Sequence, residues 1–197
     1  MSAGHNALRG SVPVKTRVRV FGLMSASAGC GHAAAKSLCP LRAASNGRTI
    51  VDLSAQRYAK DMAAIVSIQS VPARKLAAVR RQVAIGAVGS AWRPALDQVW
   101  KFLGSRPGLR TDGHNIFLYH HPTDCDALMN VDFGVEVTRA FDRSGEVYAT
   151  ETPAGEVAMA VHIGGYDRLR DTHDAIHAWV AAHQRLFGGC SWEIYGD

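Results

Sequence analysis

The residue best suited to chemistry is Glu193, which lies in the run SWEIY near the end of the sequence. The run is rich in residues that favour strands, and side chains alternate between the two faces of a strand. Glu193 therefore shares a face with Ser191 and Tyr195, whereas Trp192 and Ile194 share the other face. We expect the apolar pair to pack against a helix layer. Charged side chains are mostly exposed, so alternation alone favours a carboxylate that faces water.

An earlier predicted strand, residues 115–121, has the same alternation. Its apolar residues Ile116 and Leu118 share one face, while Phe117 and Tyr119 share the other. Each of the two strands thus places aromatic side chains on one face, and in the second strand a carboxylate accompanies them.

The predicted elements that carry these strands occur twice from residue 64 onward. Two extended segments joined by a proline–alanine bend come first, a helix follows, and a strand comes after it. In the first copy these are 65–71, 75–83, a helix from about Ser90 to residue 104 and strand 115–121, with a further strand over 130–141. In the second copy they are 147–152, 156–163, a helix over 167–187 and strand 191–195. The duplication predicts an α+β fold with two helices on one side of the sheet.

Charge is distributed unevenly along the chain. Residues 1–60 carry nine lysines and arginines and one acidic residue, a formal charge of +8. Residues 61–197 carry thirteen and sixteen, a formal charge of −3. The acidic balance of this main segment argues against contact with nucleic acid. No apolar run approaches the ~20 residues that a membrane span needs, so we expect no membrane association.

The cysteines show neither a CxxC pair nor a regular spacing, which argues against a zinc site or a disulfide framework. They are Cys30, Cys39, Cys125 and Cys190. We therefore expect reduced thiols in a cytoplasmic protein that uses no metal and no other cofactor.

Residues 1–61 are rich in Ala, Ser, Gly and Arg and have no sustained period, which predicts a disordered leader or a true start at Met62. Within them, residues 18–21 could form a strand, and residues 29–34 spell GxGxxA, the outline of a dinucleotide-binding fingerprint. Five residues, 24–28, separate Leu23 from the first glycine, and Pro40 would break the next helix. We therefore do not expect a nucleotide site.

The second copy contains HIGGY at 162–166, Trp179 in the following helix and WEIY at 192–195, and the first copy opens with IQSVPARKLA at 68–77. In these motifs, residues 64–197 resemble the GyrI-like small-molecule-binding domain, also known as the AraC-type or bacterial transcription activator effector-binding domain. The resemblance implies an antiparallel sheet built from two strand–helix–strand–strand modules. It also implies a cleft for small hydrophobic or cationic ligands, which we expect on the face of the sheet opposite the helices.

Members of this family usually continue into a final strand after the WExY motif, but the sequence ends at Asp197. We therefore expect the domain, residues 62–197, to lack its last strand. The second module would then have an unpaired edge, or an edge that a partner chain completes.

If the modules face each other as in this family, Glu193, Tyr195, Phe117 and Tyr119 line one cleft. A carboxylate walled by aromatic rings is desolvated and lowers its energy by meeting a cation. The ring faces add cation–π attraction. The same desolvation could instead prepare Glu193 as a general acid or base, with Tyr195 orienting a water molecule.

Three further residues join the candidate ligand-binding set. Glu136 lies on the face of its strand opposite the valines and is either a second cleft carboxylate or a solvated side chain. Trp92 belongs to the core or forms the floor of the cleft. His162 sets the turn between strand and helix or reaches the ligand.

Two groups of histidines raise the question of a metal. His173 and His177 are spaced i, i+4, which can hold a metal ion, but no third ligand is evident, so we expect an exposed helical face. His120 and His121 with Cys125 show no standard metal-ligand spacing.

The leading functional hypothesis is a stand-alone sensor or sequestering domain that binds small amphipathic or cationic molecules around a buried glutamate. One alternative is a hydrolase of small hydrophobic compounds that uses Glu193 and Tyr195. Another is a module that inhibits a protein partner such as a topoisomerase. A homodimer or a regulatory partner protein is compatible with each of these hypotheses.

Overall fold

The computed structural model describes residues 16–25, 64–84, 86–123 and 128–196 of the chain. Its first half contains β1 (Thr16–Ser25), β2 (Val66–Val71), β3 (Lys75–Val83), α2 (Val88–Gly104), η1 (Pro107–Leu109) and β4 (Arg110–His120). Its second half contains β5 (Met129–Val137), β6 (Tyr148–Glu151), β7 (Gly155–Gly164), η2 (Tyr166–Arg168), α3 (Leu169–Ala182) and β8 (Leu186–Tyr195). The GxGxxA segment and three of the four cysteines lie outside the described residues.

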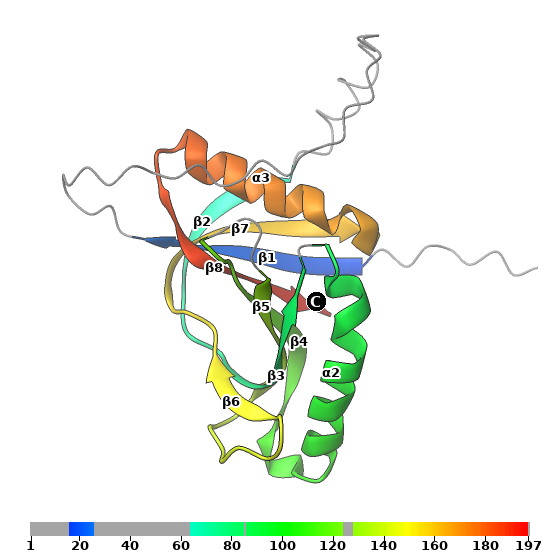
Figure 1. Ribbon diagram of the computed structural model, residues 1–197. Coiled ribbons are helices and arrows are strands. Elements are labelled where there is room, and N and C mark those ends of the chain that lie inside the picture. The colour runs from blue at the N-terminus through cyan, green and yellow to red at the C-terminus, as the bar shows by residue number, and fades with distance from the viewer. Residues whose placement is uncertain (1–15, 26–63, 85, 124–127, 197) are drawn as a thin grey trace, which may run out of the picture.

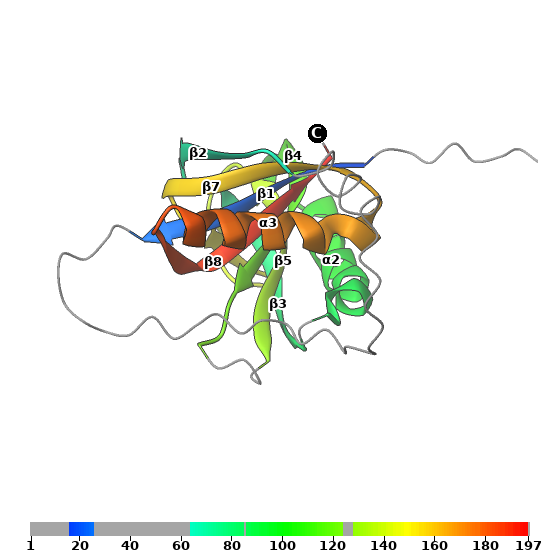
Figure 2. The same ribbon diagram turned by 90° about the horizontal axis from the view of Figure 1, so that it is seen from above.

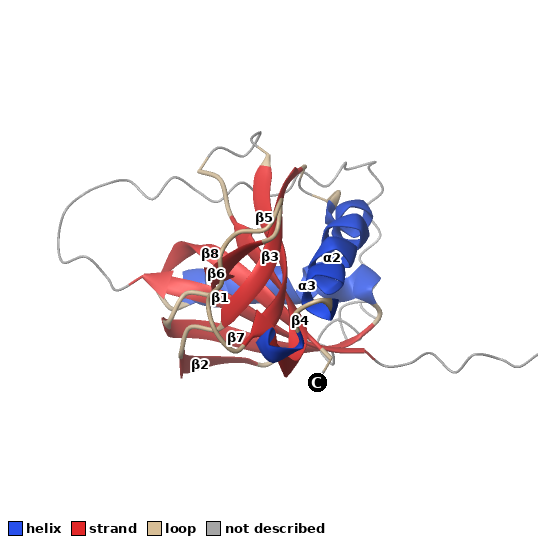
Figure 3. Ribbon diagram, turned by 90° about the horizontal axis from the view of Figure 1, so that it is seen from below, coloured by secondary structure: helices blue, strands red, loops and turns tan. Residues whose placement is uncertain are grey.

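The strands form one antiparallel sheet in the order β2-β7-β1-β8-β4-β5-β3-β6 (Figure 1). The order is symmetric about the β8–β4 pair, because β7, α3, β8 and β1 correspond to β3, α2, β4 and β5. β2 and β6 occupy equivalent places at the two ends of the strand order. Figure 3 shows β2 at one margin of the sheet, beside β7. The predicted α+β fold, with two helices and a duplicated module, is confirmed.

Strand β1 corrects the prediction for the leader, because residues 16–25 lie inside the sheet rather than in a disordered segment. It pairs with β7 from Thr16↔Gly164 to Leu23↔Val157 and with β8 from Val18↔Tyr195 to Ser25↔Leu186. Val18 and Val20 are fully buried, which explains why this alternating segment joins the core. β1 takes the place that β5 takes in the first module. The predicted unpaired edge next to the WEIY strand is therefore wrong.

The helices bury apolar stripes against the two halves of the sheet. α2 buries residues spaced by three and four, namely Ala95, Leu96, Val99, Phe102 and Leu103. It begins at Val88, two residues before the predicted start, so that Pro94 lies inside the helix rather than in its first turn. α3 buries Leu169, Thr172, Ile176 and Val180, and it lies along β7 and β1 (Figure 2).

The end of α3 differs from the prediction, which placed the stop at Gly188-Gly189. The helix ends at Ala182, and Gln184 has a left-handed backbone with φ of 54°. Arg185 N–H then donates to the carbonyl of Val180 at 3.0 Å, which closes the helix end. β8 consequently starts at Leu186 and includes both glycines.

Each face of the sheet buries its own apolar residues. On the helix face, one cluster lies under α2 and another under α3. The opposite face buries a third cluster, formed by Phe21, Leu76, Ile116, Leu118, Val157, Trp192 and Ile194. Because Leu76 in β3 and Val157 in β7 share this cluster although four strands separate them in the sheet order, the sheet must bend around it.

Candidate functional site

Glu193 lies at the centre of the sheet, where the two modules meet. In β8 it pairs with Val20 of β1 on one side and with Phe117 of β4 on the other. Its side chain is only 3% exposed. It faces the helices, because it contacts His173 of α3, whereas Trp192 and Ile194 belong to the cluster on the opposite face. The expected orientation of this strand is therefore reversed, and the candidate site lies on the helix side of the sheet.

Both oxygens of the Glu193 carboxylate have hydrogen-bond partners. The Tyr119 hydroxyl donates to Oε2 at 2.5 Å, and the Tyr195 hydroxyl donates to the same oxygen. The other oxygen, Oε1, lies 2.7 Å from Nε2 of His173. The partners come from β4, β8 and α3, so the carboxylate links side chains of both modules.

Burial, strengthened by the negative charge of Glu193, raises the pKa of Tyr119 well above its ordinary value. The same causes raise the pKa of Tyr195. An ionised phenol next to a carboxylate would place two negative charges in a dry environment, which is unfavourable. Both hydroxyls therefore keep their protons at neutral pH and act as donors that fix the position of Oε2.

Aromatic rings surround this cluster. The ring centroid of Tyr195 lies 4.7 Å from that of Phe117 and 5.8 Å from that of Tyr166. Trp92 of α2 lies 6.4 Å from Phe117 on the first-module side. Tyr166 is 57% exposed, so the row of rings extends from the buried carboxylate to the surface.

The structure brings five of the seven predicted site residues together and separates the other two. Glu193, Tyr195, Phe117 and Tyr119 form one group, and Trp92 joins it through Phe117. Glu136 lies elsewhere and forms an ion pair with Arg74 at 3.0 Å.

His162 is committed to the turn that precedes α3. Its Nδ1 lies 2.9 Å from the Thr172 hydroxyl, and its Nε2 lies 3.0 Å from the carbonyl oxygen of Gly165. Because a carbonyl only accepts, Nε2 must carry the proton that it donates. This contact agrees with the predicted role of His162 in setting the turn.

Sequence reasoning missed His173, which it placed on an exposed helical face. Its side chain is 19% exposed and faces Glu193. The signal was the position of His173 beside Thr172 and one turn from Leu169 and Ile176, which places it at the margin of the buried stripe. In the part of the chain that the structure describes, no group of three His, Cys, Asp or Glu residues could hold a metal ion.

Two further histidines, His121 and His177, lie on the same side of the sheet as Glu193, beside Ser191 of β8. Nε2 of His121 lies 2.7 Å from the Ser191 hydroxyl, and the His121 ring lies 5.9 Å from that of His177. Burial and the neighbouring histidines lower the pKa of His121 to about 4. Nδ1 of His177 is buried and has no hydrogen-bond partner among the described residues.

A hollow of about 320 Å³ lies away from this cluster, and none of its lining residues belongs to it. It is lined by Arg106, Gly108, Leu109, Arg139, Ala140, Phe141 and Asp142. Among the described residues, no helix has the length and apolar character needed to cross a membrane.

Comparison with solved structures shows the same fold in a known protein. The crystal structure of the EcmrR C-terminal domain matches with a TM-score of 0.53 and 20% identity, covering 68% of this chain and 96% of that domain. The cryo-EM structure of the EcmrR–DNA complex in EcmrR-RPo matches with a TM-score of 0.54 and 20% identity. That match covers 73% of this chain and 60% of the EcmrR chain. A search of curated proteins gave no match.

A family model matches residues 65–197, the span that contains both modules except β1. The model describes the GyrI-like small-molecule-binding domain. The chain therefore belongs to the GyrI-like small-molecule-binding domain family.

Proposed function

We propose that this domain binds small amphipathic organic cations, with Glu193 as the anionic anchor, and acts as a stand-alone sensor or sequestering domain. The observation that carries the proposal is a carboxylate that is 3% exposed at the junction of the two modules. Among the described side chains, neither lysine nor arginine forms an ion pair with it, and His173 is its one basic neighbour.

The energetic argument rests on desolvation. A buried carboxylate has lost most of its hydration, and a cation compensates this loss better than neutral donors do. The adjoining aromatic faces add about 0.5–2 kcal/mol for each well-placed cation–π contact. A ligand that combines positive charge with apolar surface would use both terms and would also pack against the rings, whereas a small inorganic cation has no apolar surface to bury.

The hydrogen bonds suggest which oxygen a ligand would meet. Two tyrosine hydroxyls donate to Oε2, while the one polar partner of Oε1 among the described residues is the His173 ring. A ligand cation would therefore take the place of His173 at Oε1. Tyr166 and Trp92, at the outer ends of the row of rings, would contact its apolar part.

The test is calorimetric titration with tetraphenylphosphonium, an aromatic cation, and with triphenylphosphine oxide, a neutral analogue. We expect saturable binding of the cation and at least tenfold weaker binding of the neutral analogue. Glu193→Gln should weaken cation binding at least tenfold, about 1.4 kcal/mol, because the substitution removes the charge and keeps the shape. Glu136→Gln is the matched control, because Glu136 pairs with Arg74 outside the site, and it should leave the affinity within twofold.

Equal affinity in Glu193→Gln and Glu136→Gln would contradict the proposal, as would equal binding of the cation and the neutral analogue. The tyrosine and histidine contacts of Glu193 are also compatible with acid–base chemistry, which favours the hydrolase as the second candidate. If the domain only binds ligands, small esters should be recovered unchanged after incubation with it. Ester hydrolysis that is lost in Glu193→Gln would identify the hydrolase instead.

A further inference from the structure

The sheet face opposite Glu193 carries a second polar cluster that the proposed function does not use. Cys190, His120 and Asp132 belong to three neighbouring strands, β8, β4 and β5. His120 pairs directly with Cys190 and lies diagonally from Asp132, because its own partner in β5 is Asn130. Direct and diagonal cross-strand neighbours have Cβ atoms about 5 and 7–8 Å apart, which histidine and aspartate side chains can bridge.

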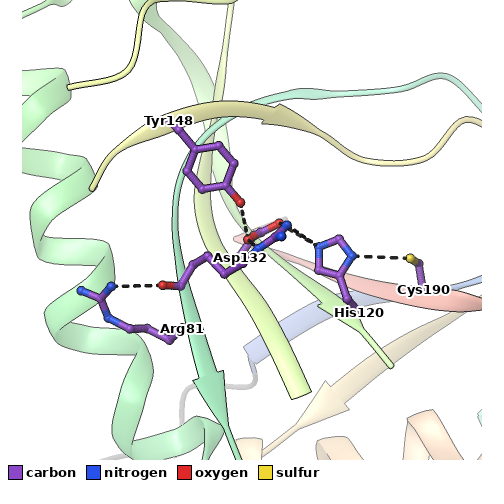
Figure 4. A network of polar contacts seen from close by, with 6 residues as sticks. Arg81, His120, Asp132, Tyr148 and Cys190 are labelled. Atoms are coloured by element: carbon purple, nitrogen blue, oxygen red, sulfur yellow. Dashed lines mark hydrogen bonds and ion pairs between the residues drawn. The ribbon is translucent and has the colours of Figure 1, made fainter. Parts of the chain in front are cut away.

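The three side chains form a connected row (Figure 4). Sγ of Cys190 lies 3.8 Å from Nδ1 of His120, and Nε2 of His120 lies 2.8 Å from Oδ2 of Asp132. This is the order of nucleophile, base and orienting carboxylate that activates nucleophiles in catalytic triads. Since Asp132 accepts a hydrogen bond from Nε2–H, the neutral imidazole presents the lone pair of Nδ1 to the thiol.

Asp132 is held firmly in this arrangement. It is fully buried, and Arg80 donates from Nε to Oδ1 at 2.7 Å and from an Nη to Oδ2 at 2.8 Å. The Tyr148 hydroxyl donates to Oδ1 at 2.6 Å. Despite burial, these hydrogen bonds, with that from Arg80 the largest, lower the pKa of Asp132 to about 2. The carboxylate therefore stays ionised and aimed at His120 at all physiological pH values.

The charge around His120 favours the imidazolium that forms when Nδ1 takes the Cys190 proton. The hydrogen bond to Asp132 and then the contact with Cys190 raise the pKa of His120 to about 9. An Nη of Arg80 also lies 3.1 Å from Nε2 of His120. The ion pair with Asp132 neutralises the charge of this guanidinium. His121, the next residue, faces the other side of the sheet and contacts Ser191.

We propose that Cys190, His120 and Asp132 form a second chemical site, at which the Cys190 thiolate captures soft carbon electrophiles such as α,β-unsaturated carbonyl compounds. His120 takes the thiol proton at Nδ1, and Sγ then bonds to the β-carbon of the electrophile. The π electrons of the C=C bond move toward the carbonyl group and give an enolate, whose α-carbon takes the proton back from Nδ1. The sum is addition of S–H across the double bond, with no oxidant or further reactant.

Access and local donors both favour this class of electrophile. The His120 side chain is 33% exposed and Cys190 is partly exposed, so both residues of the pair reach the surface. Acyl transfer needs donors for a developing oxyanion, but the nearby guanidinium of Arg80 and hydroxyl of Tyr148 are committed to Asp132. In conjugate addition the negative charge is shared between the oxygen and the α-carbon of the enolate, and the proton that His120 holds neutralises it.

The test uses the full chain with Cys30, Cys39 and Cys125 replaced by serine, so that Cys190 is the single thiol. Acrylamide is the probe, and intact-mass spectrometry follows adduct formation from pH 5 to 10, with N-acetylcysteine as the reference thiol. An unperturbed thiol has a pKa of about 8.5, so the reference reacts half-maximally near that pH. We expect Cys190 to reach its half-maximal rate at least one pH unit lower.

His120→Gln should slow the reaction at pH 7 at least tenfold and move the half-maximal pH up to that of the reference. Asp132→Asn, which removes the charge on a positioning residue, should move it in the same direction. Circular dichroism verifies that each variant is folded. If one of the two variants does not fold, the pH profile of the parent chain still tests the proposal. A parent profile equal to that of N-acetylcysteine, or an unchanged rate in folded His120→Gln, would overturn the proposal.

Discussion

At the scale of single residues, the Glu193 carboxylate is oriented before any ligand arrives. Tyr119 and Tyr195 fix one oxygen from two different strands, so little side-chain freedom remains to be lost on binding. Ordering a flexible charged side chain would cost a ligand about 0.5–1.5 kcal/mol of its affinity. The tyrosines therefore serve affinity without needing to touch the ligand.

His121 gives a prediction for acid stability. Burial, with the charges of His177 and His173, lowers its pKa to about 4, whereas the unfolded chain has the ordinary value of about 6.5. Between these values the unfolded chain binds a proton that the folded chain does not. The free energy of unfolding should therefore fall as pH falls from 6.5 to 4, by at most about 1.4 kcal/mol per pH unit for this group. Urea unfolding across this range measures the slope.

His121→Gln should make that slope shallower, because glutamine does not titrate and can still reach the Ser191 hydroxyl. His177, whose pKa is also lowered by burial, should retain part of the slope. A slope that is identical in the parent and in His121→Gln would show that this histidine is not buried as described.

At the scale of elements, β1 is the least expected part of the sheet and the easiest to test. Val20 is fully buried and lies directly opposite Glu193 in the register. Val20→Asp would place an unpaired carboxylate beside another one in the core, so we expect a loss of about 3–5 kcal/mol in the free energy of unfolding. Urea unfolding followed by circular dichroism measures it.

Arg17→Asp is the matched control, because it introduces the same side chain at an exposed position of the same strand. It should change the free energy of unfolding by no more than about 1 kcal/mol. Equal stability of the two variants would contradict the insertion of β1 between β7 and β8.

The limits of sequence reasoning are also visible at this scale. The two modules could be predicted because the spacing of apolar residues in α2 and the alternation in β4 and β8 are local signals. The place of β1 could not, because its partners, such as Gly164 for Thr16, lie far away along the chain. The orientation of β8 was wrong because alternation groups Trp192 with Ile194 but does not say which face carries the helices. Both faces of this bent sheet bury apolar clusters.

At the scale of the whole molecule, one continuous sheet couples the two modules. Trp192 is 2% exposed, stacks on Phe21 with centroids 5.3 Å apart, and pairs with Leu118 across the junction. Trp192→Ala should lower the free energy of unfolding by about 3–5 kcal/mol. Because both modules share this core, fluorescence and circular dichroism should report a single coincident transition.

Trp179→Ala is the comparison for this change, since Trp179 of α3 is only partly buried and stacks on His183 at the surface. It should cost less than Trp192→Ala. Two separate transitions, or a larger loss at Trp179, would mean that the modules unfold independently.

The insertion of β1 between the two strands that come later in the sequence has a consequence for biosynthesis. β1 leaves the ribosome first, but β7 and β8 are made more than a hundred residues later, as the Thr16↔Gly164 pairing shows. Sheets that depend on such distant pairs form slowly, and until they form, the apolar side chains and edges of their strands stay exposed. A nascent chain halted before Gly155 offers β1 neither neighbour, so we expect chaperones to engage this segment throughout translation.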